Sequence, residues 1–186
     1  LPEEVIFCKH CVISNQRPSS SVEFKHKQNE KKATICFDAE GMCDACRYHE
    51  VKEKRISWEK REQSLSQLLD KHRRSDGGYD IIVPGSGGKD SAYTSHILKY
   101  KYGMNPLTVT WAPHKYTEIG WKNFQNWIHV GGLDNILFTP NGKLHRYLTN
   151  LAFKNLLHPF QPFIIGQRIV GPLFAKQFGV ELIMYG

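Results

Sequence analysis

A buried strand, a glycine-rich loop and the start of a helix follow one another directly in residues 79–91. The apolar run from Ile81 to Val83 is typical of a buried strand in a parallel sheet. The loop from Ser86 to Lys89 consists largely of small residues, whose backbone N–H groups stay open to an anion, and a helix is expected to begin near Asp90. The positive end of a helix favours a bound phosphate. The segment therefore predicts a phosphate-binding cradle, with a glycine-rich turn that binds no ligand as the alternative.

Two other phosphate-binding loops do not fit this segment. A Walker A loop ending at Gly88-Lys89 requires glycine at position 83 and serine or threonine at position 90, where the chain has Val83 and Asp90. A dinucleotide-binding fingerprint that starts at Gly85 requires glycine or alanine at position 90. What remains resembles the Ser-Gly-Gly-x-Asp-Ser loop of the PP-loop (N-type) ATP pyrophosphatase superfamily. That resemblance implies that the chain grips the β,γ-pyrophosphate of ATP and transfers AMP to an oxygen of its substrate.

Four cysteines form two C-x-x-C pairs, Cys8 with Cys11 and Cys43 with Cys46. In a chain without the features of a secreted protein, such pairs indicate a tetrahedral metal site rather than disulfides. Four thiolates complete the coordination of one Zn²⁺ and leave no open position for catalysis. The sequence therefore predicts a structural zinc site. His10 is an alternative ligand, and a redox pair or unliganded thiols are the alternative to a metal.

Composition and charge set the broader class. The 186 residues allow one domain with a small appendage. The chain has no run of about 18 apolar residues and does not begin with a basic region followed by an apolar stretch, so we expect a cytoplasmic protein without a membrane span. The net charge of +7 favours anionic partners, which include nucleic acid but equally ATP and nucleotide-sugar phosphates. The basic runs at 52–55 and 71–74 are alternatively solvated helix faces.

Three regions are expected along the chain. Residues 1–50 are predicted to form the zinc-binding module, residues 51–78 a charged helix and linker, and residues 79–186 the loop-containing α/β domain. The charged helix has Ser57 as its expected N-cap. Because the chain stops directly after a strand, we expect the α/β domain to continue beyond it.

Strand and helix signals alternate in the third region. The strands are expected at 81–83, 107–111, 135–139 and 180–185, and the helices after the loop at 120–130, 143–157 and 171–178. This alternation predicts a doubly wound parallel sheet. In the helix at 143–157, Leu144, Leu148 and Leu151 recur at helical spacing and are expected to be buried.

The order of these features resembles one branch of the superfamily, the N-acetyl sugar amidotransferases of lipopolysaccharide and sialic-acid-like sugar biosynthesis. The shared pattern runs from Cys8 to Gly186. It comprises Cys8-x-x-Cys11, Arg17-Pro18, Gly41-x-Cys43-x-x-Cys46, Trp58, Arg61-Glu62, Tyr79-Asp80, Ser86 to Ser91, Pro106-Leu107-x-Val109 and Gly131-x-x-Asp134. The loop alone indicates only the superfamily. The two cysteine pairs, followed by a tryptophan-containing helix and then the loop, point to this branch of it. Members are longer than this chain, so much of the sugar pocket is expected outside it.

The family resemblance implies conversion of a sugar acetamido group to an acetamidino group, through adenylylation of the amide oxygen and displacement of AMP by ammonia. The implied ATP-binding residues are Pro84, Gly85, Ser86, Gly87, Gly88, Lys89, Asp90 and Ser91, with Thr110 and Trp111 as backbone contacts to adenine. Ser86, Lys89 and Asp90 are the implied catalytic residues, with Asp90 also the candidate ligand of Mg²⁺. Ordinary strand-end residues are the alternative for Thr110 and Trp111. The segment 165–167 is expected either to close the site or to be a loop without a role.

No residue of the chain is an evident glutaminase nucleophile. An N-terminal nucleophile requires cysteine where Leu1 stands, and Cys36, expected to be half-buried on a strand at 33–37, is the one cysteine outside the predicted metal site. The resemblance therefore implies a separate glutaminase subunit, akin to that of histidine biosynthesis, and a nucleotide-sugar substrate.

One alternative function is tRNA modification by thiolation or lysidine-type chemistry, although thiolases commonly have a cysteine in the nucleotide domain and none follows Cys46. A zinc-ribbon adaptor for nucleic acid is a further alternative, against which the intact Lys89 and Asp90 argue.

Overall fold

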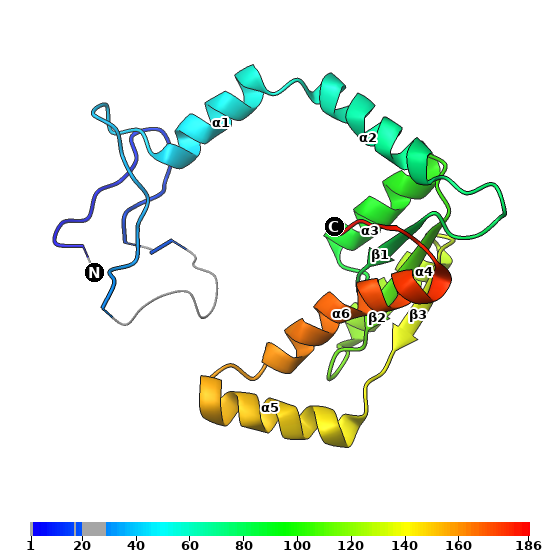
Figure 1. Cartoon of the computed structure of the whole chain (residues 1–186). Helices are drawn as coiled ribbons and strands as arrows, with labels where there is room; N and C mark the ends of the chain where they lie inside the picture. Colours follow the sequence, from blue (N-terminus) through cyan, green and yellow to red (C-terminus); the bar gives the residue numbers. More distant parts are fainter. Residues whose placement is uncertain (1, 17, 20–28) are drawn as a thin grey trace. The chain divides into compact units, whose positions relative to one another are not determined.

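The computed structural model describes residues 2–16, 18–19 and 29–186. It divides the chain into two compact units, Leu1–Arg61 and Glu62–Gly186 (Figure 1). Leu1 and Arg17, both used in the sequence interpretation, lie outside the described residues. The domain boundaries expected at residues 50 and 78 stay predictions. Within the described part of the chain, no helix is both long enough and apolar enough to cross a membrane.

The first unit consists mainly of loops, which are followed by helix α1, Asp44–Arg55. Helix α1 begins inside the second cysteine pair, because the Cys43 side chain caps it by accepting a hydrogen bond from the Cys46 backbone N–H. The strand expected at 33–37 is reduced to single bridges at Thr34 and Phe37, and Cys36 is exposed rather than half-buried. That expectation was wrong because the described residues around Cys36 form no sheet that could bury it.

Helix α2, Trp58–His72, follows α1 and continues into the second unit. The hydroxyl of Ser57 accepts a hydrogen bond from the Lys60 backbone N–H at 3.3 Å, which agrees with the predicted N-cap. The far end of the helix is anchored by Leu69, which is fully buried.

The second unit is built on a four-stranded sheet in the order β3-β2-β1-β4, with every neighbouring pair parallel. The strands are β1, Ile81–Pro84; β2, Pro106–Trp111; β3, Asp134–Phe138; and β4, Leu182–Ile183. Side chains alternate between the two faces of a sheet, so Ile82 and its partner Leu107 face one side while Ile81 and Val83 face the other.

Helices cover both faces of this sheet (Figure 1). Helix α6, Gln161–Phe178, packs on the face of Ile82 through Val170 and Phe174. Helices α2 and α3, Lys89–His96, and the π-helical turn Ile97–Lys101 lie on the opposite face, where Leu69 and Leu98 contact Ile81 and Val83. Helix α4, Glu118–His129, joins α3 there, because the Trp127 indole N–H donates to the Ser95 hydroxyl at 2.8 Å. The predicted doubly wound parallel sheet is therefore confirmed.

The chain adds β2 and β3 on one side of β1, and then returns to add β4 on the other. The order of the strands thus reverses between β1 and β4. In open α/β sheets, ligands bind at the carboxyl ends of the strands beside such a reversal. The loop that follows β1 lies at this position.

Helix α6 is ten residues longer than the helix predicted at 171–178, and Ile165 to Gln167 belong to it rather than to a loop. The helix was not predicted at its full length because glycines and an internal proline, Pro172, are unfavourable inside helices. The glycines have a packing role, since a Cβ on Gly166 would lie 2.2 Å from the Trp111 ring and a Cβ on Gly171 would lie 2.8 Å from Pro84. Both glycines therefore let α6 approach the sheet closely.

Helix α5, Gly142–Leu156, precedes α6 and packs against it (Figure 1). Its leucines were expected to be buried, but Leu144 is 57% exposed, Leu148 40% and Leu151 36%. The expectation was wrong because an amphipathic pattern shows that a helix has an apolar face without showing that the chain itself covers that face.

Candidate functional site

The loop between β1 and α3 is shaped by contacts that only glycine permits. Gly87 has φ +80°, and a Cβ there would lie 2.8 Å from the Cα of Phe124 in α4. Gly85 approaches Ser91 so closely that a Cβ would lie 2.4 Å from the Ser91 Cβ. Larger residues at either position would displace the loop from α3 or α4. The path of the loop is therefore fixed by tertiary packing.

The N-terminus of α3 emerges directly from this loop. Gly88 is the N-cap residue, and no side chain caps the helix. The first N–H groups of α3 therefore have no side-chain acceptor, and they combine with the helix dipole to favour an anion. The Ser91 hydroxyl donates a hydrogen bond to the Gly88 carbonyl at 3.2 Å and holds the first turn.

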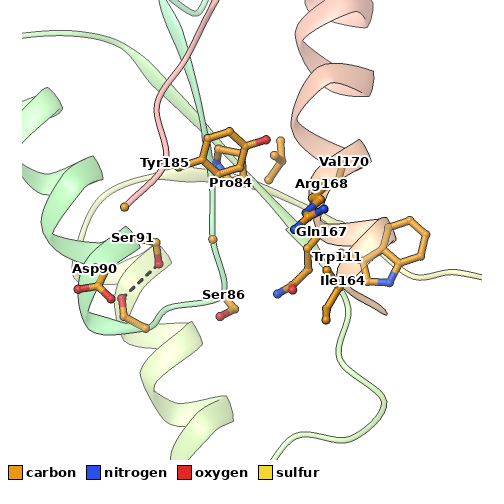
Figure 2. Close-up of a pocket in the computed structure, with 14 residues that line it drawn as sticks. Pro84, Ser86, Asp90, Ser91, Trp111, Ile164, Gln167, Arg168, Val170 and Tyr185 are labelled. Carbon is orange, nitrogen blue, oxygen red and sulfur yellow. Dashed lines mark hydrogen bonds between the residues drawn. The ribbon is translucent and has the colours of Figure 1, made fainter. Parts of the chain in front are cut away.

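A cavity of about 380 Å³ opens beside the loop (Figure 2). It is lined by the ends of β1 and β2, the start of α3, one side of α6 and the residues after β4. Figure 2 shows Asp90 and Ser91 on one side of the cavity and Gln167, Arg168 and Trp111 on the other. The volume lies in the range of small-molecule sites.

Most of the predicted nucleotide-binding residues meet at this cavity. Those that line it are Pro84, Gly85, Ser86, Gly88, Asp90, Ser91 and Trp111. Gly87 instead faces a second cavity, between α3 and α4. The side chain of Lys89 is 88% exposed, and its Nζ lies 2.6 Å from Asp90 Oδ1. Thr110 is buried on the opposite face of the sheet, where its hydroxyl accepts a hydrogen bond from the Asn135 amide at 3.1 Å, so its side chain does not reach the cavity.

Arg168 was not among the residues predicted from the sequence. Helix α6 places it at the cavity with Ile164 and Gln167, and it forms no ion pair within the described residues. These residues lie at i, i+3 and i+4, which is one face of a helix. That spacing becomes informative only once residues 161–170 are known to be helical. An unpaired guanidinium opposite the α3 N-terminus makes the cavity still more favourable for an anion.

The four predicted metal ligands come together in the first unit. Their Sγ atoms all lie within 4.8 Å of one another, with Cys8 and Cys46 3.9 Å apart and Cys11 and Cys43 3.8 Å apart. Four sulfurs placed about 2.3 Å from one Zn²⁺ in a tetrahedron would be about 3.8 Å apart. The cluster can therefore hold a metal ion such as zinc. His10 does not belong to the cluster; it contributes a backbone N–H that donates to Cys8 Sγ at 3.4 Å.

Hydrogen bonds around the cluster suit thiolates. The backbone N–H of Cys43 donates to Cys8 Sγ at 3.3 Å, and that of Cys46 donates to Cys43 Sγ at 3.4 Å. Burial raises the pKa of the Cys8 thiol, but the N–H groups of Cys43 and His10 outweigh it and bring this pKa down to about 6. The neighbouring thiols of Cys11 and Cys43 raise the pKa of Cys46 to about 12. Four thiolates thus repel one another unless a cation lies between them.

Comparison with known proteins relates the chain to one fold and to no single family. No family model matches it. A stretch of 53 residues is 36% identical to "Uncharacterized protein MJ1599" of Methanocaldococcus jannaschii and covers 28% of this chain and 19% of that protein. Among solved structures, NMN synthetase from Francisella tularensis is similar with a TM-score of 0.50 and 15% identity, over 67% of this chain and 52% of that one.

The likeness to NMN synthetase shows that this chain shares its α/β fold. At 15% identity the likeness extends to the fold alone. The chain spans about half the length of NMN synthetase and about a fifth of the archaeal protein.

Proposed function

We propose that this chain binds ATP at the loop between β1 and α3 and transfers AMP from it to an oxygen of a second substrate. The observation that best supports this proposal is the uncapped N-terminus of α3, which opens onto the cavity at the strand-order reversal. The fold that the chain shares with NMN synthetase, and the resemblance of its loop to that of the PP-loop superfamily, support it further.

In the proposed first step, the acceptor oxygen attacks the α-phosphorus of ATP, and the bond from that phosphorus to the bridging oxygen breaks. Pyrophosphate leaves with the bonding electrons, so negative charge grows on the leaving group. In this proposal the N–H groups of Ser86 to Gly88 and of the uncapped first turn of α3 stabilise this charge. Arg168 is free to pair with a phosphate from the opposite side of the cavity.

Lys89 and Asp90 supply the charged side chains at the start of α3, directly after the loop. The flexible Lys89 stem allows its ammonium group to leave Asp90 and pair with the pyrophosphate. Asp90, which lines the cavity, is the carboxylate suited to hold Mg²⁺. When bound, Mg²⁺ would neutralise charge on the phosphates.

We further propose that the acceptor is the acetamido oxygen of a nucleotide-activated sugar. The combination of the cysteine cluster, the Trp58 helix and the loop supports this assignment through the family resemblance. Ammonia would then attack the activated carbon, expel AMP and leave an acetamidino group after losing a proton. The ammonia would come from a separate glutaminase subunit, and the reaction would serve surface polysaccharide biosynthesis in the cytoplasm.

An oxygen-18 label tests the acceptor and the bond that forms. Substrates carrying the label in the acetamido carbonyl should transfer it to AMP, with ATP and ammonium at raised pH as the other reactants. Glutamine alone should not replace ammonium, because the chain has no evident glutaminase nucleophile. The products are read by mass spectrometry. Unlabelled AMP, release of ADP, or turnover without a sugar would contradict the sugar assignment.

Modification of tRNA is the second candidate, and the net charge of +7 favours it. The same preparation incubated with ATP and unmodified tRNA distinguishes the two. If the acceptor is a sugar, the masses of the tRNA nucleosides should not change. A modified nucleoside formed in the absence of sugar would show that the chain modifies tRNA.

A further inference from the structure

An apolar groove runs between α5 and α6, outside the proposed ATP cavity. Its volume is about 530 Å³. The two helices contact each other in the second unit, and α5 supplies one wall of the groove and α6 the other. Trp111 lines both the groove and the ATP cavity, so an occupant of the groove would lie next to the nucleotide site.

The groove is lined by large aliphatic side chains at helical spacing. Leu144, Leu148 and Leu151 stand at i, i+4 and i+7 on α5, and Ile165 and Ile169 stand at i and i+4 on α6. Ile165 is 47% exposed and Ile169 52%, and the leucines are similarly exposed. No lysine, arginine, aspartate or glutamate lines the groove. A contiguous exposed apolar surface of this kind marks an interaction site.

The helices around the groove are basic throughout. Residues 135–180 contain no aspartate or glutamate but five cations, Lys143, Arg146, Lys154, Arg168 and Lys176. None of these cations forms an ion pair within the described residues. The two helices that form the groove therefore carry positive charge with no carboxylate of their own to balance it, and Lys143 and Lys154 directly adjoin the lining residues Leu144 and Asn155 in the sequence.

We propose that this groove docks an amphipathic helix of a partner protein, with leucine-like residues on the face that enters the groove and glutamate or aspartate on its flanks. The apolar face would cover the aliphatic side chains, as in other helix-in-groove complexes. The acidic flanks would meet cations of α5 such as Lys143 and Lys154, which supplies the charge complementarity of a specific interface.

The same observations disfavour two other occupants. A second copy of this face would bring two sets of cations together, with no carboxylate from residues 135–180 of either copy to pair with them. An anionic membrane would satisfy the charges, but the apolar residues line a concave groove between helices, whereas surface-bound amphipathic helices insert a continuous apolar face into lipid. A helix is the partner that fits both the concave shape and the charge.

Fluorescence anisotropy with a designed peptide tests the proposal on the full chain. The probe is a labelled helix of about 15 residues, close to the length of α5, with leucines on one face and glutamates beside them. Saturable binding is expected, and it should weaken as salt rises. Two control peptides, one with lysine replacing glutamate and one with the same composition scrambled, should bind at least about tenfold more weakly.

Groove variants locate the binding. Leu148→Gln combined with Ile169→Gln should weaken binding of the acidic peptide by about tenfold or more, because both side chains line the groove, one from each helix. Ile119→Gln is the matched control, since Ile119 is 74% exposed but lies on α4, outside the groove. Unchanged circular dichroism would show that the variants fold.

Each contrary outcome overturns the proposal. No saturable binding, or equal binding of the lysine peptide, would exclude an acidic helix as the occupant. Binding unaffected by the groove variants would place the contact elsewhere. Binding to phosphatidylglycerol vesicles but not to the peptide would assign the face to a membrane. A dimer in sedimentation that Leu148→Gln dissociates would assign it to a second copy.

Discussion

The two units of this chain maintain their structures by different means. In the described part of the first unit, Cys8 and Cys43 are the only buried residues, and both belong to the cysteine cluster. In the second unit the sheet buries apolar side chains on both faces, with Ile82 against α6 on one side and Ile81 against Leu69 on the other. The first unit has a metal-ligand cluster where the second has a hydrophobic core.

This contrast explains what each unit requires in order to fold. A segment of about 60 residues without an apolar core needs a metal or covalent bridges for stability. The loop between β1 and α3, by comparison, is held by the packing of Gly85 and Gly87 against α3 and α4. The first unit should therefore respond to chelation and the second should not.

Removal of the metal is expected to have the largest effect. Structural zinc contributes on the order of 10 kcal/mol to small zinc domains, so a strong chelator or Cys43→Ser should unfold the first unit. Elemental analysis should give about one zinc per chain before chelation and none after it. Proton NMR should show the loss of dispersed signals from the first unit alone.

Cys36→Ser is the matched control, because Cys36 is exposed and outside the cluster. It should leave both zinc content and stability unchanged. A metal-free chain with a fully folded first unit would contradict the role assigned to the cluster.

Substitutions in the loop between β1 and α3 should lower activity without lowering stability, which is the opposite of the effect expected for the cysteine cluster. Lys89→Ala and Asp90→Ala should each lower kcat by at least about 100-fold, because the phosphates and Mg²⁺ proposed as their catalytic partners are present only with bound ATP. Zinc content and thermal stability should stay at wild-type values, because both side chains are largely exposed. Steady-state kinetics that remain near normal in either variant would show that this loop is not the pyrophosphate site.

Arg168→Ala should have a smaller effect. The guanidinium lines the cavity but lies opposite the loop, so its loss should weaken ATP binding by about tenfold, a size typical of one charge-assisted hydrogen bond. Lys176→Ala, a cation of the same helix that does not line the cavity, is the control. Equal titration curves for Arg168→Ala and wild type would remove Arg168 from the site.

Local patterns were sufficient to predict the strand, loop and helix start from Ile81 to Ser91. Each of these elements is determined mainly by residues close together in the sequence. Strands and helices also alternate regularly along the chain, which is the pattern of a parallel sheet. The cysteine cluster was predictable for the same reason, since two short spacings fix four ligands.

The residues that sequence could not predict depend on contacts between distant segments. Gly166 and Gly171 look like helix breakers, and their helix is stabilised by its close approach to Trp111 and Pro84. Arg168 was therefore not predicted either, because it lies on the part of α6 that the sequence did not indicate as helical. Leu144 and Leu148 have the spacing of core residues, and whether another part of a chain covers such a face is not encoded in the spacing.

Backbone amide chemical shifts test the central claim, that the α3 N-terminus binds the pyrophosphate part of ATP, most directly. In ¹⁵N-labelled chain titrated with ATP and Mg²⁺, the largest shifts should occur at Ser86 to Ser91, with a second group around Arg168 in α6. Pyrophosphate should reproduce the shifts of Ser86 to Gly88, and AMP, which lacks the β- and γ-phosphates, should not. Shifts confined to the first unit or to the groove between α5 and α6, or equal responses of the loop to AMP and pyrophosphate, would contradict the account.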